Sequence, residues 1–261
     1  MIKKLFKKIA YLPELFRKYK VLRNQDLLND KVSAKELEQY LYACNGIGRH
    51  RGYLRSLREG MCVDNNGDPI PWYTYPVIDQ LAKWDFSNCE IFEFGCGNST
   101  QWWAQRARSV VSVESTADWY QKIMDSKILP DNVTPILVRT DEGERQAALD
   151  RYVGILDQYG KFDVIVIDGE AENRTRYASA RAAIPHLKTN GMIILDNSDW
   201  LPETCQLLRD AGLIEIDYCG NGPLNTHAET TSLFLGKDFQ VRPLNAIHPG
   251  YTIGGLQLVW G

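Results

Sequence analysis

Residues 91–100, Ile91-Phe92-Glu93-Phe94-Gly95-Cys96-Gly97-Asn98-Ser99-Thr100, decide the fold. A short apolar run that ends in a Gly-x-Gly turn predicts a buried strand leading directly into a helix. Ser99 or Thr100 can cap that helix, which we expect over residues 101–107. The glycines permit a sharp turn and a close approach of the backbone to a ligand, although a tight turn can also exist without one. The stretch therefore predicts a ligand-binding strand-turn-helix.

The residues around the turn indicate which ligand it holds. A dinucleotide site has a third glycine where this chain has Thr100, and no basic residue stands near the turn to hold a pyrophosphate. Glu93 would repel a pyrophosphate but suits a ligand with an ammonium group. The next strand, residues 109–114, ends in Glu114, nineteen residues after Gly95, where a carboxylate can accept both hydroxyls of an adenosine ribose. Together these features predict S-adenosylmethionine.

At these positions the sequence resembles the class I S-adenosylmethionine-dependent methyltransferases, which have a Rossmann-like fold. Glu93, Gly95, Gly97 and Glu114 match the cofactor-binding pattern of that class, and the order of elements matches over residues 70–261. The resemblance implies that these four residues bind the cofactor.

Two further cofactor contacts are implied by the same resemblance. An acid just beyond the third strand often binds the adenine amino group in this class, and Asp141 stands there, although acids in turns are also commonly only solvated. The chain before the first strand often covers the cofactor, which gives Tyr75, with its neighbours Trp72 and Tyr73, that role. Ordinary packing of this aromatic segment is the alternative.

Strands and helices alternate through the rest of the chain, which predicts a parallel, doubly wound α/β sheet. We expect strands at residues 133–138, 162–169 and 191–197, and helices at residues 117–129, 145–158, 174–187 and 201–211. The last two strands, residues 213–219 and 231–235, are joined by a connection too short for a crossover helix, so they should pair antiparallel. The predicted fold is a mostly parallel seven-stranded sheet with a C-terminal antiparallel hairpin strand.

Polar side chains follow several of these strands. In open α/β sheets, ligands bind beyond the carboxyl ends of the strands, so these side chains should line one crevice. They are Glu114, Asp141, Asp168, Asp196 and Asn197.

Methyl transfer requires a group that accepts the proton of the methylated atom. Asp168, Asp196 and Asn197 resemble the metal-ligand set of the catechol and caffeoyl-coenzyme A O-methyltransferases, which implies a Mg²⁺ site. The match is partial, because the lysine base those enzymes often carry three residues after the first Asp is absent here. In a metal-free alternative, Asp168 is the general base and Asn197 and Asp199 bind substrate. Residues 196–199 also suit a helix-capping loop.

His227 lies in the hairpin connection, residues 220–230, which should reach the same end of the sheet. It could serve as a base of near-neutral pKa. An exposed loop histidine without a role is the alternative.

The charge of the chain is uneven. Residues 1–23 hold eight Lys or Arg and one acid, a balance of +7, which leaves −10 for the remainder. An acidic body argues against a nucleic-acid partner. The basic, amphipathic pattern of residues 1–23 suits contact with an anionic membrane surface, a partner or the chain's own domain.

These patterns predict that the chain has two parts, an N-terminal extension and a catalytic domain. Residues 1–60 form a basic helical extension, including a helix over residues 37–43 opened by a capping box at Ser33–Glu36, and a solvated linker rich in Gly and Arg. Residues 61–261 form the methyltransferase domain. The six cysteines show no Cys-x-x-Cys pair, and no apolar run is long enough to span a bilayer, so we expect a cytoplasmic location, peripheral to the membrane if residues 1–23 bind it.

The function expected from the sequence is S-adenosylmethionine-dependent O-methylation of a small molecule or of a glycan or lipid-linked intermediate. One rival is a non-catalytic S-adenosylmethionine-binding module at a membrane surface. The other is an NAD-dependent oxidoreductase, which Thr100 and the terminal hairpin disfavour.

Overall fold

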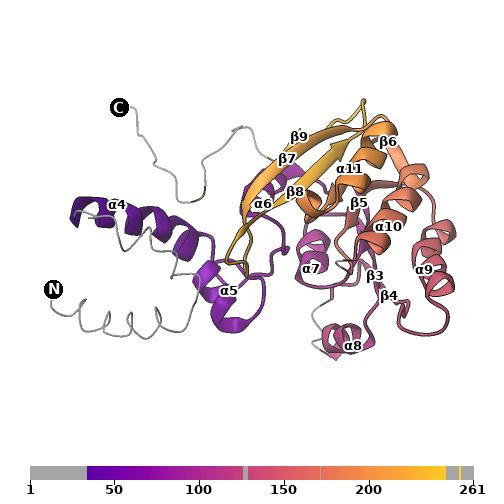
Figure 1. The fold of residues 1–261 in the computed structure, drawn as a ribbon, viewed down its shortest axis with the longest axis horizontal. Coiled ribbons are helices and arrows are strands. Elements are labelled where there is room, and N and C mark those ends of the chain that lie inside the picture. The colour runs from indigo at the N-terminus through magenta and orange to yellow at the C-terminus, as the bar shows by residue number, and fades with distance from the viewer. Residues whose placement is uncertain (1–33, 126–128, 171, 245–252, 254–261) are drawn as a thin grey trace. The chain divides into compact units, whose positions relative to one another are not determined.

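A computed structural model describes residues 34–125, 129–170, 172–244 and 253. Its centre is a seven-stranded sheet with the strand order β4-β3-β2-β5-β6-β8-β7 (Figure 1). The strands are β2 Glu90–Phe94, β3 Ser109–Glu114, β4 Val133–Leu137, β5 Phe162–Ile167, β6 Leu187–Leu195, β7 Ile214–Asn221 and β8 Ala228–Leu235. Neighbouring strands from β4 to β6 pair in parallel, and β8 pairs antiparallel with both β6 and β7. The predicted fold, including the antiparallel hairpin strand, is confirmed.

Helices cover both faces of this sheet because the central strands are apolar on both sides. On one face Ile91 of β2 packs with Trp103 of α7, Asn98–Ala104, and with Ile78 of α6, Tyr75–Leu81. On the other face Phe92 and Phe94 pack with three helices. These are α9 Arg145–Val153, which continues as a 3₁₀ helix Gly154–Gln158, α10 Asn173–His186 and α11 Pro202–Asp210. The remaining helix of this region is α8, Ala117–Asp125.

Two predicted boundaries move for physical reasons. Helix α7 begins at Asn98 rather than at residue 101, because the hydroxyl oxygen of Thr100 accepts the backbone N–H of Gly97 (2.9 Å) from inside the first turn. Strand β6 begins at Leu187 rather than at residue 191, since Leu187 already pairs with Phe162 of β5. Both changes leave the carboxyl ends of the strands in place.

The expected linker is folded instead of solvated. Residues 46–50 form a short π-helix, followed by α5, Tyr53–Glu59. The Arg51 guanidinium forms an ion pair with Asp79 (2.5 Å) and lies over the Tyr75 ring, 5.4 Å from its centroid. Gly52 has φ +80°, and a Cβ there would come within 2.3 Å of the Asp64 backbone. Arginine pairing and close backbone packing therefore hold this segment on α6.

The chain divides by its contacts into residues 1–45 and 46–261, whereas the sequence places the domain boundary at residue 60. Of the first unit, the described part is α4, Ala34–Asn45, which includes the helix expected over residues 37–43. In the second unit a short strand β1, Trp84–Asp85, pairs with β9, Arg242–Pro243. Residues 1–23 lie outside the described residues, so their contact with a membrane stays a prediction. Within the described part, no helix has the length and apolarity to cross a membrane.

Candidate active site

The turn after β2 depends on Gly95. Its φ is +113°, and a Cβ there would lie 2.9 Å from the backbone oxygen of Asp168, at the end of the neighbouring strand β5. Its N–H donates to the carbonyl of Val113 on the other neighbouring strand (2.8 Å). Gly97 is extended instead, and a Cβ there would meet the Trp119 indole at 3.7 Å. Gly95 is thus needed for the turn itself, whereas a Cβ at Gly97 would make only an ordinary van der Waals contact with Trp119.

Glu93 lies beneath this turn and is fully buried. Its Oε2 accepts hydrogen bonds from the hydroxyls of Thr100 (2.5 Å) and Ser112 (3.1 Å). Burial raises the pKa of Glu93 to about 7, although these hydrogen bonds act in the opposite direction. Glu93 therefore joins β2, β3 and the start of α7 below the turn.

The raised pKa of Glu93 predicts a pH dependence of stability. The protonated acid is favoured in the fold, so its contribution is complete below about pH 4.5 and is lost as the pH rises to about 7. The unfolding free energy of the wild type, relative to that of Glu93→Gln, should fall by at most about 3 kcal/mol across this window. Urea titrations of both proteins between pH 4 and pH 8 measure it, and a difference that stays constant with pH would refute the raised pKa.

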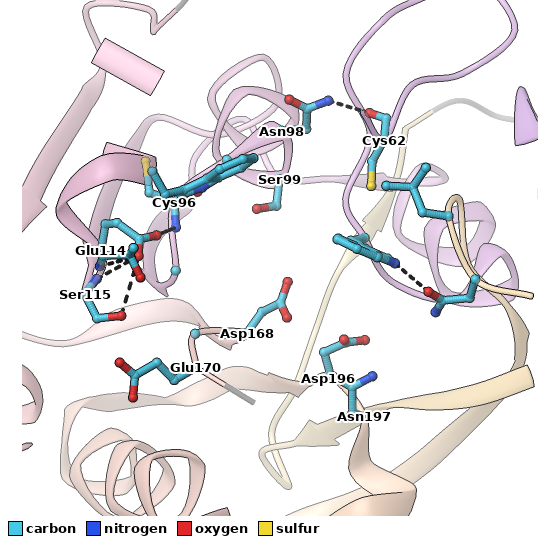
Figure 2. A pocket seen from close by; sticks show the side chains of 18 of the residues that line it. Cys62, Cys96, Asn98, Ser99, Glu114, Ser115, Asp168, Glu170, Asp196 and Asn197 are labelled. Atoms are coloured by element: carbon cyan, nitrogen blue, oxygen red, sulfur yellow. Dashed lines mark hydrogen bonds between the residues drawn. The ribbon is translucent and has the colours of Figure 1, made fainter. Parts of the chain in front are cut away.

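A cavity of about 570 Å³ opens at the carboxyl ends of the parallel strands (Figure 2). In this view Asp168 lies between Glu114, at the left, and Asp196, at the lower centre. Most of the site residues expected from the sequence line this cavity: Gly95, Gly97, Glu114, Asp168, Asp196, Asn197 and His227. The sheet topology thus brings together side chains that lie far apart in the sequence.

Five of the expected site residues are not among the described residues that line the cavity. Asp199 instead accepts the backbone N–H of Thr230 (3.0 Å), and Tyr73 is fully buried. Glu93 lies under the turn. Asp141 forms an ion pair with Arg139 (2.8 Å) and its side chain is 67% exposed. Tyr75 is buried in the core, on the face where Ile91 and Trp103 pack. Trp72, from the same aromatic segment, does line the cavity.

Glu114 is a carboxylate held in place by backbone donors. Its Oε1 accepts the N–H groups of Ser115 (2.9 Å) and Thr116 (2.8 Å), and its Oε2 accepts that of Cys96 (3.2 Å), as the dashed lines in Figure 2 show. Burial raises its pKa, against the effect of these bonds. Each carboxylate oxygen has more than one acceptor site, so a rigid acceptor remains for a ligand hydroxyl.

Arg176, in the first turn of α10, organises the acidic end of the cavity. Its guanidinium donates to four backbone carbonyls, those of Ile167 (2.9 Å), Gly169 (2.8 Å), Glu170 (2.9 Å) and Asp196 (3.0 Å), and to Oδ1 of Asp168 (3.3 Å). The arginine is only 3% exposed. It therefore holds the ends of β5 and β6 together and orients Asp168.

Asp168 and Asp196 are close enough to affect each other's ionisation. Burial and the charge of Asp196 raise the pKa of Asp168 well above its usual value, although Arg176 lowers it. Burial raises the pKa of Asp196 to about 6, against the hydrogen bond that its Oδ1 accepts from Thr231 (2.7 Å). A raised pKa makes the ionised carboxylate a stronger base than that of an ordinary aspartate.

Sequence reasoning missed Glu229, which lines the cavity and is 4% exposed. Its carboxylate accepts the side-chain amides of Asn197 (2.8 Å) and Asn225. Burial raises its pKa to about 7. The signal was the direction of β8: because this strand runs antiparallel to β6, its first residues reach the edge where the parallel strands end. Sequence reasoning also missed Arg176. It lies in the first turn of α10, the helix that follows β5, and such a first turn lies at the edge where the parallel strands end.

The donor set does not fit the Mg²⁺ site that the sequence suggested. Arg176 already contacts Asp168, and Asn197 directs its amide N–H toward Glu229. No group of three or more His, Cys, Asp or Glu side chains suited to a metal ion is found in the described parts of the chain. A cation at Asp168 would compete with the guanidinium that donates to Oδ1 of that side chain.

Residues 92–198 match the family model of a methyltransferase domain. No curated protein matches the chain. Similar solved structures include precorrin-6Y C5,15-methyltransferase from Geobacter metallireducens (17% identity, 68% of this chain and 94% of that chain, TM-score 0.46). Another is the N-methyltransferase NodS from Bradyrhizobium japonicum (10% identity, 72% of this chain and 93% of that chain, TM-score 0.42). A third is precorrin-8W decarboxylase from Methanobacterium thermoautotrophicum (20% identity, 66% of this chain and 95% of that chain, TM-score 0.42).

The family match, the strand order and the glycine turn facing Glu114 define a class I S-adenosylmethionine-dependent methyltransferase domain. The chain thus carries a methyltransferase domain over residues 92–198.

Proposed function

We propose that this enzyme methylates an oxygen atom of a small molecule or of a glycan or lipid-linked intermediate. The observation that carries the proposal is the group of carboxyl side chains, Asp168, Asp196 and Glu229, that lines the same cavity as the glycine turn. A hydroxyl group is a poor nucleophile until its proton is removed, and these side chains offer acceptors for that proton.

The cofactor end of the cavity is formed by the turn at Gly95–Gly97 and by Glu114. When bound, S-adenosylmethionine supplies an electrophilic methyl group. Glu114, fixed by its three backbone donors, accepts the ribose hydroxyls. The backbone of the turn would hold the methionine part. Asp141 and Tyr75 have less support as cofactor contacts, because neither lines the cavity.

Asp168 is the proposed general base. It lies at the end of β5, beside the glycine turn, and Arg176 donates to its Oδ1 (3.3 Å). The Asp168 carboxylate would accept the proton of the acceptor hydroxyl, while bound S-adenosylmethionine would supply the methyl group. His227 is exposed on the hairpin connection and lines the same cavity, where it can pass the proton to solvent.

The cofactor assignment is tested by comparing two acids at the ends of neighbouring strands. Glu114→Gln should weaken the binding of S-adenosylhomocysteine by roughly 10- to 100-fold, because a charged hydrogen-bond acceptor for the ribose contributes about 1.5–3 kcal/mol. Asp141→Asn should leave the affinity unchanged, since Asp141 lies outside the cavity. Isothermal titration calorimetry measures both. Equal losses in the two variants, or no loss in Glu114→Gln, would contradict this arrangement.

A further inference from the structure

The charges of the cavity restrict the acceptor. Five acids line it: Glu114, Asp168, Glu170, Asp196 and Glu229. Among the described lining residues, Arg176 is the one lysine or arginine. A guanidinium has five N–H donors, and Arg176 already makes five hydrogen bonds to the protein. No donor of this arginine remains for a phosphate or carboxylate group of an acceptor.

Three tryptophans line the same cavity. Trp119 lies beside Gly97 at the glycine turn, whereas Trp72 and Trp200 leave about half of their surface in contact with solvent. Trp72 and Trp200 are each 48% exposed. The Trp72 ring is fixed in place because its indole N–H donates to Oδ1 of Asn225 (2.9 Å). Trp200 is the last residue of the 3₁₀ helix Ser198–Trp200, which begins directly after Asn197. Such partly exposed aromatic rings can pack against the apolar face of a flat ligand while its edge stays hydrated.

Hydrogen-bond acceptors lie next to these rings. Each carboxylate oxygen of Glu229 accepts one amide N–H, from Asn197 or from Asn225, and each has a further lone pair. Asn225 also holds Trp72, so the aromatic and acidic groups belong to one connected network. Ligand hydroxyl groups can donate to these acceptors without bringing a charge into the cavity.

We propose, on the basis of the function above, that the acceptor part of this cavity recognises an uncharged ring bearing several hydroxyl groups, such as a sugar residue. One face of the ring packs on Trp72 or Trp200, and its hydroxyls donate to Glu229. Acceptors that carry a phosphate or carboxylate on the ring are excluded because five acids and a single arginine line the cavity in the part of the chain that the structure describes. These acids would also attract an ammonium group, so the test must distinguish an uncharged sugar from an amino sugar.

The test keeps one sugar ring and changes only its charge. Saturation-transfer NMR is recorded with the full-length protein and S-adenosylhomocysteine, using methyl α-glucoside, methyl α-rhamnoside, glucose 6-phosphate, glucuronate and glucosamine as probes. We expect signals from the neutral glycosides and none from the two anionic sugars. Trp200→Ala should weaken the binding of the neutral glycosides by up to about tenfold, which is the scale of one aromatic contact. Tyr177 is an exposed aromatic residue of α10 outside the cavity lining, so Tyr177→Ala should leave the binding of these glycosides unchanged.

Three results would overturn the inference: anionic sugars that bind as well as neutral ones, signals from glucosamine alone, or no signal from either neutral glycoside. If calorimetry of the same sample shows that S-adenosylhomocysteine binds, each of these results contradicts only the inference about the sugar ring. The proposed function then stands. If S-adenosylhomocysteine does not bind either, the proposed function fails with it. Because Trp200 is half exposed, Trp200→Ala should keep the wild-type cofactor affinity and thermal stability, which shows that its loss of sugar binding is local.

Discussion

Replacing Arg176 with methionine should lower the free energy of unfolding by about 3–5 kcal/mol. The side chain is 3% exposed and donates to four carbonyl oxygens as well as to Asp168. Its removal leaves buried carbonyls without donors and places Asp168 near Asp196 without a compensating charge. Lysine should not restore the loss, because an ammonium has three donors and cannot reproduce the planar geometry of the guanidinium.

Urea denaturation followed by circular dichroism measures this effect. Arg181→Met is the matched control, because Arg181 is exposed on the same helix, α10. It should change the unfolding free energy by less than about 0.5 kcal/mol. If Arg176→Met were as stable as this control, the ends of β5 and β6 would not depend on the guanidinium, and its role in orienting Asp168 would be wrong.

Asp168→Asn should reduce turnover by at least about 100-fold while the affinity for S-adenosylhomocysteine changes only a few-fold. Asparagine keeps the shape of the side chain but cannot take a proton, and general-base catalysis typically contributes 10²–10⁴. The cofactor contacts proposed for Gly95, Gly97 and Glu114 do not involve this carboxylate. The prediction therefore separates a catalytic group from a cofactor-binding one.

The measurement is the rate of S-adenosylhomocysteine release with a hydroxyl-bearing acceptor that the wild-type enzyme turns over, together with calorimetry for affinity. Asp157→Asn, at an exposed position paired with His186, should keep wild-type values in both. Wild-type turnover in Asp168→Asn would remove Asp168 from the mechanism. A parallel loss of turnover and affinity would assign it to cofactor binding instead.

The fold could be predicted from local patterns because each strand is an apolar run bounded by turns. Those patterns also located the carboxyl ends of the strands, which is why Glu114, Asp168, Asp196 and Asn197 were found. They could not show what a side chain packs against. Glu93 has the residue type of a ligand contact, yet it lies below the turn with the hydroxyls of Thr100 and Ser112.

The remaining differences arise from tertiary contacts between distant segments. Arg51 draws residues 46–60 onto α6 through Asp79. Arg176 contacts Asp168, one of the residues that the sequence suggested as metal ligands. Nothing near position 176 in the sequence reveals that its other partners are carbonyls at the ends of two strands. Glu229 becomes a site residue only because β8 runs against β6. Such contacts depend on the assembled sheet.

Calorimetric titration of the purified protein with S-adenosylmethionine, S-adenosylhomocysteine and NAD⁺ tests the central claim most directly. The turn at Gly95 and the carboxylate of Glu114 predict micromolar binding of both sulfur nucleotides and none of NAD⁺. Addition of Mg²⁺ should leave these affinities unchanged, because Arg176 occupies Asp168. Binding of NAD⁺, or no binding of either sulfur nucleotide, would contradict the assignment of this cavity.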